Sequence, residues 1–203
     1  MQYILVIVLS YILGSSNMAK YIAALKKVDL KSGGSGNLGA SNAVILMGWR
    51  AGLLTALHDV GKSALAVVLA RLVFPDLPLI GAAAGVASVL GHIYPFWMKF
   101  KGGKGFASYL GMTIVLNWKF AIAVLLLVVV VTLVTDYIVA ATTTTIIIVP
   151  IGLGILTQSW LLPLILLVAS AVIAWKHKDN YVRMYKGTEI GFRKAGRGDY
   201  RVK

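Results

Sequence analysis

The chain has 203 residues, of which 59% are hydrophobic and only 13% are charged. The charged share is about half that of an ordinary soluble domain, so the composition predicts an integral membrane protein and excludes a soluble globular one. The formal net charge is +13, but basic residues on membrane proteins usually face the cytoplasm and its anionic lipids, and no aromatic-rich basic module indicates a nucleic-acid partner. The lack of cysteine excludes disulfides and thiolate chemistry.

Apolar segments predict seven transmembrane helices, and four of them precede residue 117. We expect these four at residues 1–21, 51–74, 79–97 and 106–116. The first segment lacks a basic leader and an obvious small-residue cleavage site, so we interpret it as an uncleaved span and not as a signal peptide. The fourth is short for a span and starts within the glycine-rich loop that precedes it.

Three more apolar segments follow, at 120–135, 138–156 and 160–175, before a basic tail at 176–203. The four threonines at 142–145 are interpreted as structural, because threonines within a span often bond back to a carbonyl one turn earlier and bend the helix. Several of the apolar runs are shorter than the roughly 20 residues that a perpendicular helix needs, so six spans remain an alternative to seven.

The distribution of positive charge predicts the orientation in the membrane. Segments 20–35, 99–104 and 176–203 contain four, three and nine Lys or Arg residues, which is 16 of the chain's 20. Because positively charged loops stay in the cytoplasm, we expect the N-terminus outside and the C-terminus inside. The predicted fold class is therefore an all-α integral membrane protein of about seven transmembrane helices, forming one domain over residues 1–203.

The stretch 92–105 begins within an apolar segment and ends in a loop with three lysines and three glycines. Glycines let backbone N–H groups approach a ligand closely, and such groups beside lysines suit phosphate oxygens. Because the loop adjoins apolar sequence, we expect the phosphate to belong to a lipid-like molecule. A basic loop that only attracts anionic headgroups is the alternative.

Segment 32–42 is a second glycine-rich stretch, with serine hydroxyls and two amide side chains. The spacing of Gly34, Gly36 and Gly39 matches the dinucleotide-binding fingerprint, but no hydrophobic strand precedes it, so we reject that match. Such a loop before a helix suits an anion. A flexible linker is the alternative, although a linker does not need Asn37 and Asn42.

Ionisable side chains within the second span are a further candidate. Asp59 and Lys62 are one helical turn apart and can pair. Such residues within a span suggest function by default, with a self-neutralising pair as the alternative. Arg50 precedes this helix and could reach the same site. A single buried histidine such as His92 more often links helices by a hydrogen bond than acts as a catalyst.

His177, Asn180 and Arg183 follow the last span at intervals of three and share one helical face. A positively charged stop signal explains the arginine but not the histidine or the asparagine. Three polar stretches on one side of the membrane, rich in phosphate-binding groups and poor in carboxylates, indicate phosphate-bearing substrates at the inner leaflet. Three scattered histidines offer no clear ligand set, so no metal is expected.

The segments 32–42, 91–105 and 176–180 resemble the three signature motifs of the bacterial acyl-phosphate:glycerol-3-phosphate acyltransferases, the PlsY family. The resemblance covers essentially the whole chain, and it includes Asp59, Lys62 and the stretch 187–189. The chain departs from the family at Ser16-Asn17-Met18, where Ser-Ile-Pro is usual, and at Asp136, where Arg or Lys is usual. Both departures lie outside the three motifs.

The resemblance implies a seven-helix enzyme of the bacterial inner membrane whose active site faces the cytoplasm. It implies transfer of a fatty acyl group from acyl phosphate to the sn-1 hydroxyl of glycerol 3-phosphate, which gives lysophosphatidic acid in the first step of phospholipid synthesis. Neither a metal nor any other cofactor is implied. The expected partners are the two substrates and the lipid bilayer, and no nucleic acid.

Carried over residue by residue, the resemblance gives two groups of candidate site residues. Those expected to be catalytic are Ser35, Lys104, His177 and Asn180. Those expected to bind substrate phosphates are Ser32, Gly34, Gly36, Asn37, Gly39, Asn42, Arg50, Lys62, His92, Gly102, Gly103 and Gly105. Ser35 and His177 are the candidates for proton handling, although a substrate phosphate could serve as the base, and which loop holds which phosphate stays open.

The chemistry implied by the resemblance is consistent with these residue types. Acyl phosphate is a mixed anhydride and already activated, so an enzyme need only hold two phosphates and align a hydroxyl with a carbonyl, and alignment alone can contribute roughly 7–11 kcal/mol. Two other functions are alternatives. A transporter of phosphorylated metabolites would call for an internal repeat, which we do not see. A protein that only binds anionic lipids would not explain Asn37, Asn42, His177 and Asn180.

Overall fold

The structure is a computed structural model that describes residues 1–196, and all of its regular elements within that range are helices. The contacts divide the chain into two compact units, Met1–Leu116 (unit 1) and Asn117–Lys203 (unit 2). The expectation of a single domain stays a prediction. The last part of the expected basic tail, residues 197–203, lies outside the described residues.

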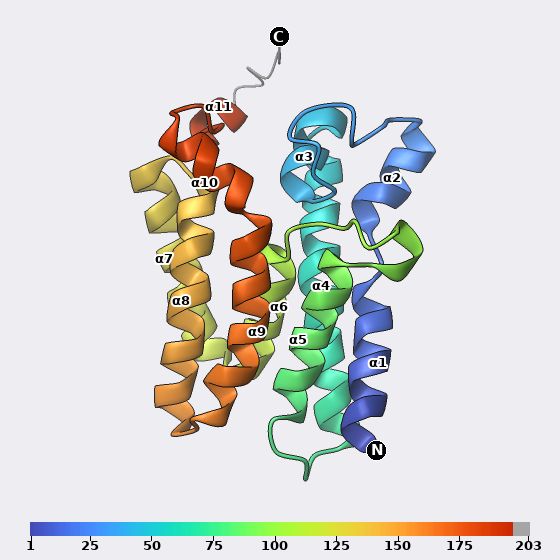
Figure 1. Ribbon diagram of the computed structural model, residues 1–203, viewed down its shortest axis with the longest axis vertical. Helices are drawn as coiled ribbons and strands as arrows, with labels where there is room; N and C mark the ends of the chain where they lie inside the picture. Colours follow the sequence, from blue (N-terminus) through green and yellow to red (C-terminus); the bar gives the residue numbers. More distant parts are fainter. Residues whose placement is uncertain (197–203) are drawn as a thin grey trace. The chain divides into compact units, whose positions relative to one another are not determined.

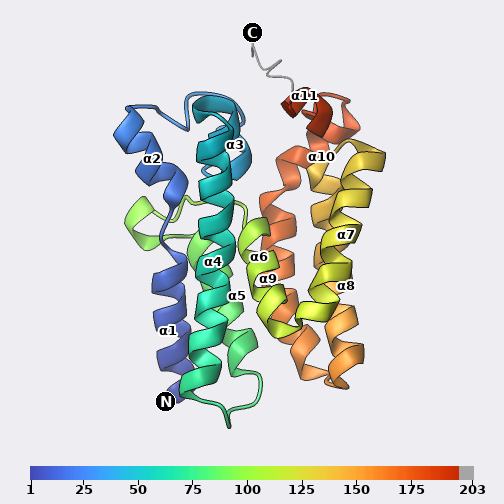
Figure 2. The same cartoon turned by 180° about the vertical axis from the view of Figure 1, so that it is seen from behind.

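Unit 1 is a bundle in which α4 packs against α1, α5 and α6, and α1 packs against α5 (Figures 1 and 2). Its elements are α1 (Gln2–Gly14), α2 (Met18–Lys26), α3 (Ala40–Met47), α4 (Trp49–Val73), α5 (Ile80–Ile93), the 3-10 turn η1 (Phe96–Met98) and α6 (Phe106–Leu116). The expected spans at 51–74 and 106–116 match α4 and α6 closely.

Glycines allow the helices of unit 1 to pack backbone against backbone. A Cβ on Gly14 would overlap the backbone of Ser88, and one on Gly91 would overlap the backbone of Tyr11, so α1 and α5 touch at two levels. In lipid, where no hydrophobic force brings helices together, such close packing between small residues is a main source of association.

The first expected span is one helix in the sequence but two in the structure. The chain leaves the α-helical path at residues 15–17, and Asn17 then caps α2, because its side chain accepts a hydrogen bond from the Lys20 N–H at 2.9 Å. The carbonyls at the break are satisfied by side chains: Trp97 donates to Ser15 at 2.8 Å, and Lys62 donates to Ser16 at 2.7 Å. A break at membrane depth needs such partners.

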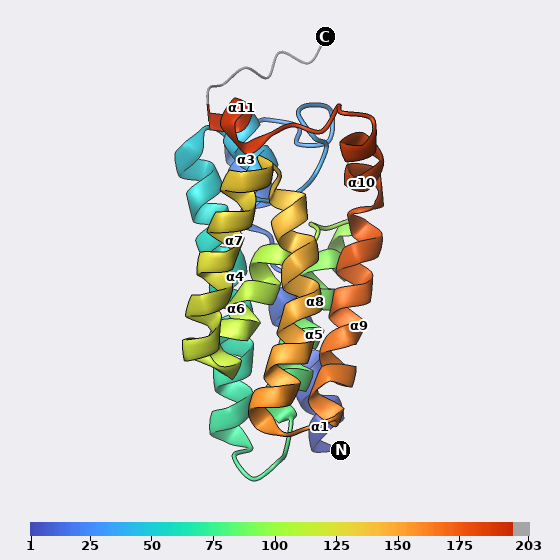
Figure 3. The ribbon, with the colours of Figure 1, turned by 90° about the vertical axis from the view of Figure 1, so that its left-hand side faces the viewer.

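Unit 2 consists of α7 (Trp118–Thr135), α8 (Ile138–Thr157), α9 (Leu161–Lys176), α10 (Lys178–Tyr185) and α11 (Phe192–Gly196). α8 packs between α7 and α9, as Figure 3 shows. The four threonines at 142–145 each donate to the carbonyl four residues earlier, at 2.8–3.0 Å, which confirms the expected back-bonding.

Asp136, the unusual residue between α7 and α8, fixes the start of α11. The Arg193 N–H donates to its carboxylate at 2.8 Å, the Phe192 N–H donates to its carbonyl at 2.6 Å, and the Arg193 guanidinium donates to the Leu133 carbonyl at 2.8 Å. The turn at Asp136 and the segment after α10 therefore lie at the same end of unit 2.

Among the described residues, five helical segments are long and apolar enough to cross a membrane. They are Gln2–Lys26, Trp49–Val73, Ile80–Met98, Trp118–Thr135 and Ile138–Thr157. A sixth results if α9 and α10, which meet at a bend of 50°, count as one span, and α6 is a shorter apolar helix. The prediction of an all-α membrane protein is confirmed, whereas the count of seven spans stays a prediction.

Candidate active site

The loop 27–39 and the start of α3 form the first part of the site, and Asn42 organises them. Asn42 is fully buried; its side-chain oxygen accepts from the Ser35 N–H at 2.8 Å, and its amide donates to the Leu30 carbonyl at 2.8 Å. Gly34 has φ +59° and lies against the same side chain, where a Cβ would overlap the Asn42 oxygen. Asn42 therefore has a defined structural role in holding the loop.

The residues that this loop presents outward are the ones that can meet a ligand. Ser32, Ser35 and Gly36 are exposed, and Asn37 is half-buried. Gly36 has φ +65°, a conformation that other residues adopt with strain. Asn17 reaches the same loop from the break before α2, because its amide donates to the Leu38 carbonyl at 3.1 Å.

The second part of the site is the loop 99–105, which we call the motif 2 loop. It folds back onto the end of α5, because the Gly102 N–H donates to the Ile93 carbonyl at 3.0 Å and the Gly103 N–H donates to the His92 carbonyl at 3.1 Å. Lys104 is half-buried, whereas Lys99 is exposed. The loop therefore leaves α5 along a path that is set by backbone hydrogen bonds.

Two glycines of the motif 2 loop have a packing reason that the sequence did not reveal. A Cβ on Gly102 would overlap the His92 carbonyl and the ring of Pro95, and a Cβ on Gly103 would overlap the His92 imidazole. We predicted these glycines as places where the backbone meets phosphate. The structure shows that the fold of the loop requires them whether or not a ligand is bound.

Beneath the motif 2 loop lies a cluster of buried ionisable side chains. The Lys62 ammonium lies 2.9 Å from the Asp59 carboxylate and 2.9 Å from Nδ1 of His92. His58, on the same helix, contacts Asp59 at 3.5 Å and Ser16 Oγ at 3.1 Å. The predicted pairing of Asp59 with Lys62 is confirmed, and His92 links α5 to α4, as expected for a single buried histidine.

Arg50 does not lie with this cluster. It stands at the start of α4, nine residues before Asp59, which corresponds to about 13 Å along a helix. Its guanidinium lies over the Trp49 ring at 5.6 Å, and the side chain is exposed. Arg50 therefore does not contact the Asp59–Lys62 pair in this structure, and its role toward a substrate phosphate stays a prediction.

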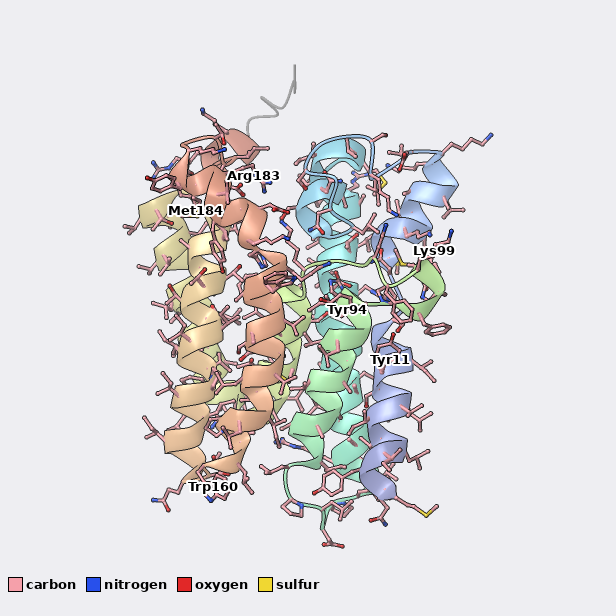
Figure 4. All side chains as sticks on the ribbon, viewed as in Figure 1. Tyr11, Tyr94, Lys99, Trp160, Arg183 and Met184 are labelled. Atoms are coloured by element: carbon pink, nitrogen blue, oxygen red, sulfur yellow. The ribbon has the colours of Figure 1, made fainter. Side chains whose placement is uncertain are left out.

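Aromatic side chains hold the segment between α5 and the motif 2 loop against α1 and α2. The Tyr11 hydroxyl donates to the Tyr94 carbonyl at 2.5 Å, and both residues lie at the upper end of α1 and α5 in Figure 4. Trp97 stacks on Tyr21 with ring centroids 5.8 Å apart, and the Lys20 ammonium lies 5.1 Å from the Trp97 ring. Tyr94 and Trp97 belong to the predicted stretch 92–105, whereas Tyr11 and Tyr21 were not singled out by sequence reasoning.

Unit 2 carries the third polar stretch. His177 ends α9 and is buried, and its Nδ1 lies 2.8 Å from the Ile173 carbonyl. A carbonyl can only accept, so Nδ1 carries the proton and Nε2 is the acceptor of the neutral ring. This tautomer suits a group that accepts a proton or a hydrogen bond.

Asn180 and Arg183 share one face of α10, as predicted, and both bind the carboxylate of Glu189. The Asn180 amide donates to one oxygen at 2.6 Å and the Arg183 guanidinium donates to the other at 2.6 Å. Arg183 lies on α10 in Figure 4. Because Nδ2 of Asn180 faces Glu189, the carbonyl end of this amide points elsewhere.

The role of Glu189 was missed by sequence reasoning. The only signal for it was the place of Glu189 in the stretch 187–189, which the family resemblance included without a role. No group of three or more His, Cys, Asp or Glu residues in the part of the chain described here is arranged to hold a metal ion.

Comparisons with known proteins agree on one family. A family model described as glycerol-3-phosphate acyltransferase matches residues 4–187. The chain is 36% identical over 191 residues to the glycerol-3-phosphate acyltransferase of Prochlorococcus marinus (strain MIT 9312), covering 92% of this chain and 95% of the relative. It is 33% identical over 192 residues to that of Geotalea daltonii, with 94% and 98% covered.

Two solved structures are similar over nearly the whole chain. The glycerol 3-phosphate form of PlsY (YgiH), an integral membrane glycerol 3-phosphate acyltransferase, matches with a TM-score of 0.90 and 31% identity, covering 97% of this chain and 98% of that one. The lysophosphatidic acid form matches with a TM-score of 0.86 and 30% identity, covering 96% and 98%.

Proposed function

The chain belongs to the glycerol-3-phosphate acyltransferase family, and from this premise we propose that it transfers a fatty acyl group from acyl phosphate to the sn-1 hydroxyl of glycerol 3-phosphate. The products are lysophosphatidic acid and phosphate. The observation that carries the proposal is the pair of glycine-rich loops in unit 1, one held by the buried side chain of Asn42 and the other by backbone hydrogen bonds to the Ile93 and His92 carbonyls. Two such loops suit two phosphorylated substrates.

The reaction we propose is a direct displacement. The hydroxyl oxygen attacks the acyl carbon, the bond from that carbon to the phosphate oxygen breaks, and inorganic phosphate leaves with its electron pair. The donor is already activated, so catalysis consists of holding both phosphates and stabilising the charge that develops on the carbonyl oxygen. A covalent acyl-enzyme would add a step without lowering a barrier.

Roles follow from the position of each side chain within its unit. In unit 1, we propose that Lys104 and the backbone of the motif 2 loop hold one phosphate and that the residues presented by loop 32–42, with Arg50, hold the other. In unit 2, Nε2 of His177 is the atom that suits transfer of the hydroxyl proton, and the side-chain carbonyl of Asn180 suits acceptance of a hydrogen bond. Ser35 and His177 are the candidates for proton handling.

We propose a seven-span topology in the inner membrane of a bacterium, with the N-terminus outside and the C-terminus and active site on the cytoplasmic side. Support comes from the positive charge of segments 20–35, 99–104 and 176–203 and from the shorter apolar helix α6, which supplies the seventh span. The turn at Asp136 falls on the cytoplasmic side in this topology, and its bond to Arg193 is consistent with that placement.

A turnover assay tests the function. Purified protein is supplied with glycerol 3-phosphate and either acyl phosphate or acyl-CoA, and both lysophosphatidic acid and phosphate are measured. We expect one phosphate per lysophosphatidic acid with acyl phosphate, and no product with acyl-CoA. Efficient turnover with acyl-CoA would overturn the donor assignment, and a protein inactive with both donors would overturn the function.

A further inference from the structure

We propose that Asp59 and Lys62 are positioning residues for the motif 2 loop. From the interior of unit 1 they hold the ring of His92, and the ring holds the backbone at Gly103, directly before Lys104. This inference rests on the proposed function only in its activity readout, because the structural readout described below does not require turnover.

The contacts of Lys62 show that its ammonium group interacts with other groups in the protein interior. The ammonium has three N–H donors. Three electron-rich atoms lie within 2.9 Å of it: the Ser16 carbonyl oxygen at 2.7 Å, Nδ1 of His92 at 2.9 Å and the Asp59 carboxylate at 2.9 Å. These atoms belong to the break between α1 and α2, to α5 and to α4. Lys62 therefore ties three elements together at one point, which differs from the phosphate-binding role predicted for it.

The ring of His92 lies between the Asp59–Lys62 pair and the motif 2 loop and contacts both. Its Nδ1 edge faces Lys62 and Asp59, and its Nε2 edge lies against Gly103 so closely that a Cβ there would overlap it. The Gly103 N–H also donates to the His92 carbonyl. A shift of the ring must therefore displace the loop backbone, and Lys104 with it.

The packing of α4 against α5 does not by itself require the charged pair of Asp59 and Lys62. A buried ion pair can often be replaced by apolar side chains without loss of stability. Beside it, Ser63 and Ser88 join the same two helices, α4 and α5, through an uncharged hydrogen bond of 2.9 Å. What the charged cluster adds, and the serine pair does not, is contact with the ring that carries the motif 2 loop.

The test compares two double variants in the full-length, purified protein. Asp59→Asn/Lys62→Met removes both charges together, so that neither is left buried and unpaired, and Ser63→Ala/Ser88→Ala is the matched control. Hydrogen exchange is followed by mass spectrometry for the peptide covering residues 100–105. We expect exchange there to accelerate at least tenfold, and acyl transfer to fall at least tenfold, in the first variant only. The control should stay within twofold of the native protein on both measures.

A third variant keeps the comparison decisive if the charge-free variant does not fold. His92→Phe retains a ring against Gly103 but removes the contact of Nδ1 with Lys62, and we expect it to accelerate exchange of the same peptide. Unchanged exchange in a folded variant, or an equal rise in the serine control, would overturn the positioning role. Lack of turnover by the native protein would instead count against the proposed function and leave the exchange result standing.

Discussion

At the scale of single residues, the same amino acid can serve the fold and the ligand, and sequence alone does not separate the two. Gly103 was predicted as a point of close approach to phosphate, and the structure adds that the His92 ring excludes any side chain there. Asn42 was predicted as a ligand-binding amide, yet both ends of its side chain are bonded to the backbone of loop 27–39. A structural role and a ligand-binding role favour the same residue type at each of these positions, so only the geometry distinguishes the two roles.

Lys104 and Lys99 provide a matched pair for the proposed phosphate site. We expect Lys104→Ala to reduce acyl transfer at least a hundredfold, because its charge is held beside Gly103 and Gly105. We expect Lys99→Ala to change the rate less than threefold, because this side chain is exposed and, in the proposed topology, lies at the end of a span, where an interfacial lysine is expected without any catalytic role. Initial rates at saturating substrates measure both. Equal losses would indicate that the loop contributes only general positive charge.

Glu189 is expected to act through Asn180 and Arg183. Glu189→Gln replaces one acceptor oxygen by an amide nitrogen, so one of the two donors loses its partner, and a charge-assisted hydrogen bond contributes about 1.5–3 kcal/mol. We therefore expect roughly a tenfold or greater drop in acyl transfer. Asp76→Asn, at an exposed acid outside the three motifs, is the control and should stay within twofold. A Glu189→Gln enzyme as active as the control would contradict this positioning role.

At the scale of elements, hydropathy located the apolar helices to within a few residues but not the breaks between them. The helices α4, α6, α7, α8 and α9 lie close to the expected spans. The breaks at Asn17 and at Gly48, which has φ +89°, were not predicted. The mean hydropathy of a segment does not detect a single capping side chain or a single residue with positive φ. Asn17 had been noted only as a departure from the family pattern.

Asn17 is expected to stabilise α2 and to position loop 32–42 at the same time. Asn17→Ala removes the cap on α2 and the bond to the Leu38 carbonyl, and loss of a cap costs about 0.5–2 kcal/mol. Asn117→Ala removes the equivalent cap on α7, where the side chain accepts from Phe120 N–H at 3.0 Å. We expect similar losses of thermal stability in both variants and a loss of activity only in Asn17→Ala. An equal loss of activity would reduce Asn17 to an ordinary cap.

At the scale of the whole molecule, the distribution of charge leads to a topology that the helix lengths alone do not determine. Within unit 2, Trp160 lies at the opposite end from Arg183 (Figure 4), so an aromatic residue and a basic one mark the two ends of the same bundle. Composition was sufficient to predict the membrane class, whereas the contacts of Glu189 and Asp136 depend on turns that no periodic pattern reports.

Single cysteines test the topology, because the native chain contains none. Ser41→Cys and Lys186→Cys are exposed positions that we place in the cytoplasm, and Gln158→Cys is an exposed position that we place outside. In intact cells whose outer membrane has been permeabilised, an impermeant thiol reagent should label only Gln158→Cys. In inverted membrane vesicles it should label the other two. Labelling of Ser41→Cys and Lys186→Cys from opposite faces would rule out the seven-span arrangement.

The most direct test of the central claim, acyl transfer from acyl phosphate straight to glycerol 3-phosphate, is to quench the enzyme during turnover and to measure its intact mass together with the products. A parallel quench uses acyl phosphate without the acceptor. We predict an unmodified protein mass in both samples, and lysophosphatidic acid and phosphate in equal amounts only when glycerol 3-phosphate is present. A stoichiometric acyl adduct on the protein, formed from acyl phosphate alone and discharged by glycerol 3-phosphate, would contradict the account.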